Sequence, residues 1–480
     1  MRLCLAGQPV NIRRFRSYRQ KDGRKVSQAA SPGPGMSRTE LRAALSLSGI
    51  YALRMLGLFM ILPVFALYAA DLEGVTPALT GLAIGVYGVT QALLQIPAGL
   101  LSDRIGRKPV IVGGLLVFAF GSVLAALADS IWLIILGRAL QGAGAIAAAI
   151  MALVADLTRE QHRIKAMAMI GMSIGLSFAL ALILGPVLGN LIGVPGIFAL
   201  TAVLALGGVL VVLFVVPRPA DLRIHREAEA IPAQFGRILT HGQLLRLDAG
   251  IFILHAILTG TFVVLPLLLR DEAAVLASDH WKIYLPVLLC SIALMIPFII
   301  LAERRGHTRT VFQGAITLLM LVLAGLYFLP LTLPSAVVML LVFFTAFNLL
   351  EAMLPSLISR VAPVDCRGTA MGFYSSSQFM GAFVGSVVAG WLHGQFGLHA
   401  FFLAAAGAAL LWLLLALGMV PPAKLSNFVY RLTGQSAVDP AGLADRLRRQ
   451  AGVAEAVVVA EEGVAYLKVD RQVFDEASLP

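Results

Sequence analysis

The chain has 480 residues, of which 59% are hydrophobic and only 13% are charged, and its mean hydropathy is +0.88. Soluble domains average about 45–50% apolar and about 25% charged residues, so this composition excludes an ordinary water-soluble enzyme. The formal net charge of +11 would suggest nucleic-acid binding in a soluble chain. In a membrane protein, however, the positions of basic residues indicate which loops lie on the cytoplasmic side. We therefore expect a polytopic membrane protein and no nucleic-acid partner.

The chain begins with a basic segment, residues 1–44, that contains no apolar run of a secretory signal peptide. We expect a disordered cytoplasmic tail there, and translation from Met36 is an equal alternative to translation from Met1. The three cysteines, Cys4, Cys290 and Cys366, are far apart and no histidine pattern accompanies them. This spacing supports neither a disulfide framework nor a metal site.

Twelve apolar runs are each long enough to cross a hydrocarbon core of about 30 Å. The first six form residues 45–216 and the last six residues 247–420, joined by a polar cytoplasmic connection over 217–246. The expected spans are 45–69, 77–101, 109–128, 131–155, 166–190, 195–216, 247–269, 283–302, 310–329, 335–358, 368–391 and 397–420.

The basic residues predict the orientation of these spans. Of the 37 Lys and Arg residues, 33 lie in the two tails and the even-numbered loops. Because basic residues accumulate on the cytoplasmic side, both termini are expected there, in an inner membrane.

Two fragments recur six spans apart. Residues 163–167, RIKAM, reappear at 367–371 as RGTAM, and residues 103–107, DRIGR, reappear at 303–307 as ERRGH. Such repeats are typical of transporters built from two parallel six-helix halves. Chance similarity between basic loops is the alternative.

Ionisable residues inside spans indicate function, because a charge at the bilayer centre costs about 2.5–3.5 kcal/mol. Arg54, Arg138, His255 and Glu351 lie in spans 1, 4, 7 and 10, with Asn348 one turn before Glu351. A recurrence every third helix predicts that these helices face one polar cavity. His255 and Glu351 are the proton-carrier candidates, because arginine stays charged. A locally satisfied structural role is the alternative for each residue.

Other polar and aromatic residues are weaker candidates for lining that cavity, because such side chains commonly serve helix packing. They are Tyr51, Phe59, Gln91, Gln95, Phe344, Tyr374 and Gln378. Three glycine pairs fit close helix packing: Gly81/Gly85, Gly171/Gly175 and Gly381/Gly385.

The loop between spans 2 and 3 resembles the signature loop of the major facilitator superfamily. It reads GLLSDRIGRKP over 99–109 and matches every defining position, namely Gly99, Asp103, Arg104, Gly106, Arg107 and Lys108. The resemblance implies that Asp103 and Arg107 hold the two halves in the outward-facing state, with Asp156 at the inner end of span 4 as acidic partner. A solvated loop that only sets topology is the alternative.

Two further motifs resemble those of the same family. Residues 137–142, GRALQG, resemble a motif whose arginine is implicated in proton coupling, which carries over to Arg138. Gly185, Pro186 and Gly189 in span 5 resemble the core of the antiporter motif, although Asn190 replaces its final glycine.

The fragments 53–57, 130–138, 156–161 and 348–358 resemble the YajR-type branch of drug efflux transporters. That branch carries a small ferredoxin-like cytoplasmic domain, which we expect over 421–480. Its pattern predicts a strand at 428–432, a helix at 441–450 and a hairpin of 456–460 with 464–469, while the chain ends before a fourth strand. Sensing, dimerisation and covering of the inner face remain open for a chain that we otherwise expect to be monomeric.

We expect an all-α proton-coupled antiporter that exports a small amphipathic molecule and uses the proton gradient without cofactor or metal. No phosphate-binding loop is present to use ATP. The alternatives are proton-linked uptake of a small solute, for example an anion, and a membrane sensor without transport. An enzyme is not expected, because no nucleophile, base and orienting group share one depth in the membrane.

Overall fold

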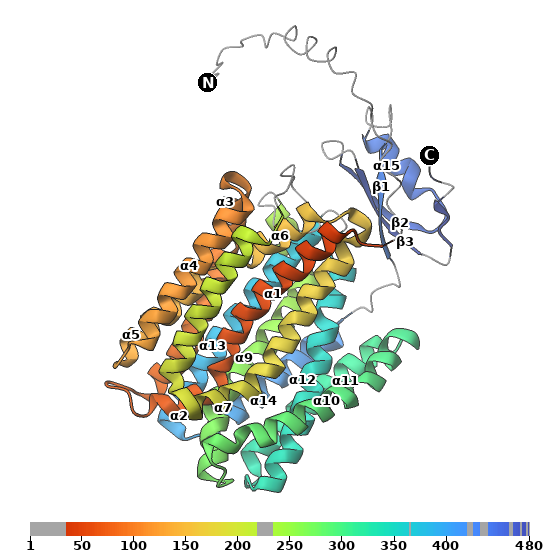
Figure 1. Cartoon of the computed structure of the whole chain (residues 1–480). Helices are drawn as coiled ribbons and strands as arrows, with labels where there is room; N and C mark the ends of the chain where they lie inside the picture. Colours follow the sequence, from red (N-terminus) through yellow and green to blue (C-terminus); the bar gives the residue numbers. More distant parts are fainter. Residues whose placement is uncertain are drawn as a thin grey trace, which may run out of the picture. The chain divides into compact units, whose positions relative to one another are not determined.

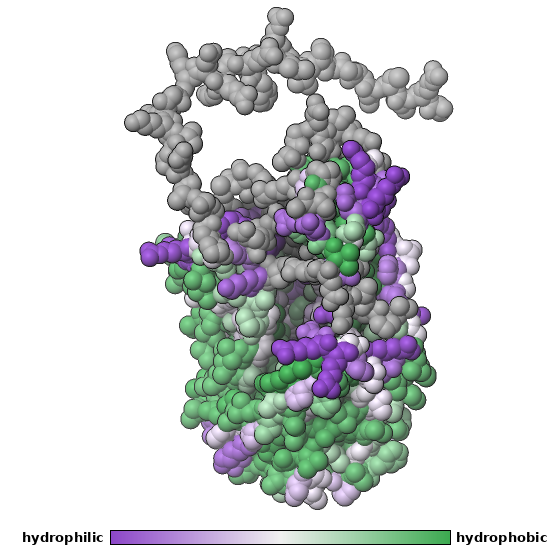
Figure 2. Space-filling model, turned by 90° about the vertical axis from the view of Figure 1, so that its right-hand side faces the viewer, coloured by the Kyte–Doolittle hydropathy of each residue, from purple (hydrophilic) through white to green (hydrophobic). Residues whose placement is uncertain are grey.

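The computed structural model describes residues 35–217, 234–363, 366–419, 426–432, 440–459, 464–470, 473–476 and 479. Long helices lie side by side through residues 38–417, and hydrophobic residues dominate the lower part of the face seen in Figure 2. Apolar side chains covering the outside of a helical bundle are expected where lipid is the solvent.

The helices of the first half depart from the expected spans at three places, and α1 also begins early, at Arg38. The expectation of a disordered tail over 1–44 is therefore wrong for residues 38–44, while residues 1–34 lie outside the described residues. Span 1 is divided at Ile61, just before Pro63, span 4 is divided around Gly144, and spans 5 and 6 are joined across a kink at Gly193, where φ is +71°. A Cβ on Gly144 would lie 2.3 Å from the Gly114 carbonyl oxygen, so this break lets span 4 approach its neighbour. The helices are α1 (Arg38–Met60), α2 (Leu62–Ala69), α3 (Pro77–Ile105), α4 (Arg107–Ala126), α5 (Ile131–Ala143), α6 (Ala147–Leu157) and α7 (Glu160–Phe214).

The helices of the second half match the expected spans more simply, although the first begins five residues early, inside the expected polar connection. Residues 218–233 of that connection lie outside the described residues. The elements are α8 (Phe235–Leu239), α9 (Gly242–Asp271), η3 (Ala277–Asp279), α10 (His280–Arg304), α11 (Thr308–Phe328), α12 (Leu333–Val361), α13 (Arg367–Phe396) and α14 (Ala400–Leu417).

Ten stretches among the described residues are long and apolar enough to cross a membrane. The stretch over Lys165–Phe214 has 50 residues and contains two spans that meet at Gly193. Helix α13 is not among the ten, but it has 30 residues, and Gly381, Gly385 and Gly390 are buried in it. The described residues therefore contain twelve spans in two sets of six, as expected.

Helices α3 and α13 join the two halves through glycine. A Cβ on Gly81 would lie 2.2 Å from the Ser386 carbonyl oxygen, and one on Gly88 would lie 2.4 Å from that of Phe379. Since real Cβ atoms do not approach so closely, only glycine permits this backbone contact. The contact continues to Ala92, whose carbonyl oxygen accepts a hydrogen bond from Ser376.

Glycine also sets the packing of α13 on α9. Cβ atoms on Gly381 and Gly385 would lie 2.1 and 2.0 Å from the carbonyl oxygens of Phe252 and Ala256. The third expected packing pair behaves differently, because a Cβ on Gly171 or Gly175 would meet nothing within 4 Å. The prediction of helix packing is therefore wrong for that pair in this conformation.

The C-terminal domain has the expected β-α-β-β order. The elements are strand β1 (Ser426–Arg431), helix α15 (Pro440–Arg448), strand β2 (Val453–Val459) and strand β3 (Val464–Val469). The three strands form an antiparallel sheet in the order β1-β3-β2. Leu443 and Leu447 of α15 pack with Ala465 and Leu467 of β3. Strand β2 begins three residues before its expected start, and the turn over 460–463 lies outside the described residues.

Candidate functional site

Three side chains from three helices of the second half meet near the middle of the bundle. The Gln378 amide on α13 donates to Nε2 of His255 on α9 at 2.7 Å, and to Oε1 of Glu351 on α12 at 3.5 Å. Nδ1 of His255 lies 3.9 Å from Oε2 of Glu351. Because Nε2 accepts from Gln378, a neutral His255 ring carries its proton on Nδ1, on the side of the carboxylate.

The facing atoms of this His255–Glu351–Gln378 cluster are incompletely bonded. Nδ1 of His255 and Oε2 of Glu351 are buried, and neither has a hydrogen-bond partner among the described residues. A buried polar atom without a partner costs about 1–3 kcal/mol. The side chains are not sealed in a core, since that of Glu351 is 36% exposed. Such an arrangement suits a site that a proton or a ligand completes.

Asn348, one turn before Glu351, points to a different neighbour. Its amide donates to the Ser291 hydroxyl at 3.0 Å and so ties α12 to α10. Phe347, between them in sequence, places its ring 6.1 Å from that of His255. Asn348 therefore supports α12 rather than joining the His255–Glu351–Gln378 cluster.

Arg54 lies on α1 in the first half and is 1% exposed. It donates to Gln91 at 2.7 Å, and Gln91 in turn donates to Gln95 at 3.2 Å. Its guanidinium lies 5.6 Å from the ring centre of Tyr87 and 5.3 Å from that of Phe118, at cation–π distance. Its Nε and Nη1 atoms have no hydrogen-bond partner among the described residues.

Arg138 on α5 is equally buried but fully bonded. It donates to Gln141 at 2.8 Å and to the carbonyl oxygens of Ala83 and Ile84 at 3.3 and 3.2 Å. These bonds tie α5 to α3 inside the first half. Neither arginine pairs with Glu351 in this conformation, so the carboxylate meets a histidine and a glutamine instead.

Tyr87 on α3 links the two groups of polar residues. Its ring centre lies 5.2 Å from the Arg138 guanidinium and 6.2 Å from the ring centre of Phe379. Phe379 directly follows Gln378. Among the described residues no hydrogen bond or ion pair joins the arginines of the first half to the His255–Glu351 pair, so convergence of spans 1, 4, 7 and 10 on one cavity stays a prediction.

Asp103, Arg107 and Asp156 form a second cluster, at the loop between α3 and α4. Arg107 pairs through Nη1 with the Asp103 carboxylate and donates from Nε to Asp156 at 3.2 Å. The side chains of Arg107 and Asp156 are 2% and 0% exposed. This loop cluster joins α3, α4 and α6, so in this conformation its ion pairs lie within the first half rather than between the halves.

The other motif residues shape the same loop. Gly106 has a φ of +100°, which side chains rarely adopt. Lys108 donates to carbonyl oxygens at the end of α7, and Arg104 is exposed. A Cβ on Gly99 would lie 3.1 Å from the Ala148 side chain, so glycine brings α3 close to α6.

The antiporter-like motif lies where α7 crosses the break between α1 and α2. A Cβ on Gly185 would lie 2.5 Å from the Met60 carbonyl oxygen, and one on Gly189 would lie 3.2 Å from Val64. Pro186 is inside the helix between them. The motif therefore packs span 5 against the discontinuity in span 1.

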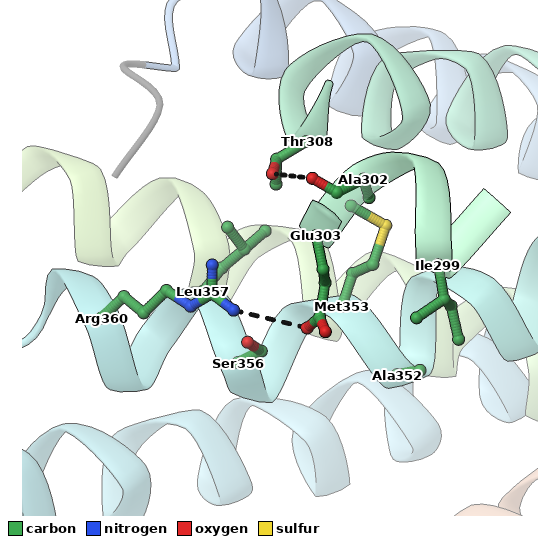
Figure 3. Close-up of a pocket in the computed structure, with 9 residues that line it drawn as sticks. All are labelled: Ile299, Ala302, Glu303, Thr308, Ala352, Met353, Ser356, Leu357 and Arg360. Carbon is green, nitrogen blue, oxygen red and sulfur yellow. Dashed lines mark hydrogen bonds and ion pairs between the residues drawn. The ribbon is translucent and has the colours of Figure 1, made fainter. Parts of the chain in front are cut away.

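A pocket between the ends of α10 and α12 is lined on α12 by residues that follow Glu351, from Ala352 to Arg360 (Figure 3). Arg360 donates to Glu303 at 3.3 Å across its mouth, and Ile299, Met353 and Leu357 give it an apolar wall. Glu303 is the repeat counterpart of Asp103, so at this position the second half has an exposed ion pair where the first has a buried Arg107–Asp156 pair.

Sequence reasoning missed Asp248 on α9. The residue is 8% exposed, and its Oδ1 has no hydrogen-bond partner among the described residues. It lies at the second position of the expected span 247–269. A charged residue so close to the end of a span is ordinarily read as part of the polar boundary of the helix and not as an intramembrane charge. Its spacing of seven residues from His255 was the available signal, because seven residues are about two turns.

Comparisons with known proteins agree with this fold. Residues 47–376 and 287–449 match the Major Facilitator Superfamily, and residues 433–478 match the YajR YAM domain. The chain is 47% identical over 438 residues to the inner membrane transport protein YajR of Escherichia coli K12, covering 91% of this chain and 96% of that protein. It is 27% identical to the multidrug resistance protein MdtH of Aeromonas salmonicida, covering 70% and 84% of the two chains.

Solved structures share the fold at lower identity. A bacterial homologue of the human lysosomal transporter Spinster, in an inward-facing and occupied conformation, gives a TM-score of 0.66 at 14% identity over 80% of this chain and 97% of its own. The human organic anion transporter MFSD10 gives 0.57 at 19% identity over 79% and 100%.

Proposed function

Because the chain belongs to the major facilitator superfamily and carries a YajR YAM domain, we propose that it is a proton-coupled antiporter that exports a small amphipathic molecule. Membrane transport is the common property of its relatives; the coupling ion and the direction are the proposal. One proton moving through 100 mV releases about 2.3 kcal/mol. That energy supports a concentration ratio of roughly fortyfold, enough for useful export.

The observation that carries the proposal is the contact of His255 with Glu351 in the middle of the second half. When Glu351 is ionised, its carboxylate accepts from Gln378 and faces His255 at 3.9 Å. A proton on Glu351 removes the charge and one acceptor, so the contacts among α9, α12 and α13 differ between the two protonation states. Such a difference is what lets proton binding shift a conformational equilibrium.

The packing of the halves supports alternating access. Their contacts run along α3 from Pro77 to Ala92, and α2 with α9 and α7 with η3 contact each other at the same end. We assign the loop between α3 and α4 and both termini to the cytoplasm from the basic residues, which makes this an inward-facing state.

Transport in proteoliposomes tests the proposal. With a pH gradient imposed, the wild-type protein should move a fluorescent amphipathic dye against its gradient. Glu351→Gln should reduce the gradient-driven flux by about a hundredfold or more, the scale on which a positioned proton-transfer group contributes. Glu73→Gln, at an exposed residue between α2 and α3, is the matched control. Equal flux in wild type and Glu351→Gln would remove Glu351 from the mechanism.

Arg54 favours a second candidate, proton-linked uptake of an anion. Its guanidinium is buried with two unpartnered nitrogens, and no carboxylate pairs with it among the described residues. A solute carrying a carboxylate would supply that partner. The same vesicles distinguish the candidates, because uptake and export accumulate solute on opposite sides for a given pH gradient. Binding without flux would instead indicate a sensor.

A further inference from the structure

Asp248 and Tyr374 lie on the faces of α9 and α13 that carry the His255–Glu351–Gln378 cluster. Gln378 on α13 contacts His255 on α9, and the Ala382 carbonyl oxygen on α13 accepts from Thr259 on α9. In both pairs the two residues are 123 positions apart in the sequence. The same offset one turn earlier places Tyr374 beside Ile251. Asp248 is one turn before Ile251, so the two polar residues are neighbours on adjoining helices.

Tyr374 is placed between two carboxylates. Its phenol interacts electrostatically with both Glu351 and Asp248, and it is only 3% exposed. The Tyr374 hydroxyl and Oδ1 of Asp248 are buried without a hydrogen-bond partner among the described residues, as are Oε2 of Glu351 and Nδ1 of His255. Four incompletely bonded titratable groups therefore follow one line through α9, α12 and α13.

We propose that Tyr374 and Asp248 extend the Glu351 site into a proton path that ends at the Asp248 carboxylate, two turns nearer the start of α9. The inference rests on the proposed proton coupling and names the route to the inner side. A proton leaves the Glu351 carboxyl and reaches the Asp248 carboxylate while Tyr374 accepts one proton and donates its own. Glu351 ends ionised, Asp248 ends neutral, and Tyr374 is unchanged.

The surroundings of Asp248 leave it available for this exchange. Arg246, on the same helix, donates to the Gly418 carbonyl oxygen at 2.6 Å. Helix α14 presents Trp412 to Gly250, and α8 carries Arg237 in its last turn. On α13, Tyr374 is a titratable group that interacts with Asp248 and also with Glu351, so it is the connection between the two carboxylates.

Labelling with dicyclohexylcarbodiimide, which attacks protonated carboxyl groups in apolar surroundings, tests the path without a transport substrate. In full-length protein in proteoliposomes, peptide mass spectrometry should find the label on Glu351 and on Asp248, decreasing at both as the pH rises. Asp279, an exposed residue paired with Lys282, should stay unlabelled. Absence of label on Asp248 at every pH, with Glu351 labelled, would overturn the path.

Flux separates failure of the path from failure of the proposed coupling. Asp248→Asn and Tyr374→Phe should each lower gradient-driven flux and shift its dependence on internal pH, while Asp279→Asn should match wild type. Wild-type flux and pH profile in both Asp248→Asn and Tyr374→Phe would overturn the path and leave the role of Glu351 intact. Wild-type vesicles that show no response to a pH gradient would overturn both.

Discussion

His255 determines how the intramembrane carboxylate is paired. An arginine would hold Glu351 permanently ionised by a strong charge-assisted bond, whereas a histidine at 3.9 Å and a neutral glutamine leave it free to exchange a proton. The buried arginines are instead held by Gln91 and Gln141 in the other half. The difference between a fixed ion pair and an exchangeable proton is thus made by single side chains.

Another histidine, His399, just before α14, gives a testable pH effect. Its ring contacts Glu272 at 2.6 Å and the Leu326 carbonyl oxygen at 2.8 Å. Burial is the largest influence and lowers the pKa of His399, but the hydrogen bonds and the Glu272 charge outweigh it and raise the pKa above 6.5. The pair therefore stabilises the fold fully below pH 6.5, and this contribution is lost as the pH rises through the raised pKa.

Thermal unfolding in detergent should reveal this contribution. The wild type should exceed His399→Gln in stability at acidic pH, and the difference should shrink as the pH rises. His307→Gln, at an exposed histidine, is the control and should follow the wild-type profile. A difference that grows with pH would contradict the assigned direction.

At the level of elements, glycine decides which helices touch. Helix α13 is the least hydropathic span, yet it is the one that contacts both α3 and α9 through backbone-to-backbone approach. Without a hydrophobic driving force between helices in lipid, such close packing is a main source of association. The small residues of α13 therefore explain two of its properties. They lower the hydropathy of the helix, and they let it pack closely between α3 and α9.

Gly385→Ala should destabilise the protein, because the added methyl group would lie 2.0 Å from the Ala256 carbonyl oxygen. Overpacking of this kind costs about 1–3 kcal/mol. Gly175→Ala is the matched control, since nothing lies within 4 Å of its Cβ position. We expect a lower unfolding temperature for Gly385→Ala alone, and equal values for the two variants would contradict the packing argument.

At the level of the whole molecule, the two halves contact each other along α3 and α13, from Gly81 and Ser386 to Ala92 and Ser376. The loop cluster of Asp103, Arg107 and Asp156 ties α3, α4 and α6 of the first half together at the other end. A rigid half that rotates about a contact at one end is the geometry of alternating access. The small C-terminal domain has a core of its own around Leu443 and Leu467.

Ala92→Cys combined with Ser376→Cys should form a disulfide in this state and stop transport, with activity restored by reductant. Cys290→Ser and Cys366→Ser remove the native thiols, and each single new cysteine is a control. Cross-linking at full transport activity would contradict a separation of the halves at this point. The rate of this cross-link also tests the loop cluster. The loop is expected to stabilise the outward-facing state, so Asp103→Asn should favour the present state and make the disulfide form faster.

The sequence by itself determined the membrane class, the two sets of six spans, the signature loop and the β-α-β-β domain. Each depends on composition, period or local spacing, which a single chain displays. The tertiary structure alone decided that Glu351 meets His255 and Gln378, that Arg138 bonds within its own half, and that Asp248 joins the line of titratable groups. Such pairings join residues up to 123 positions apart and depend on how helices rotate and approach each other, because a span's hydropathy does not fix which face it turns to its neighbour.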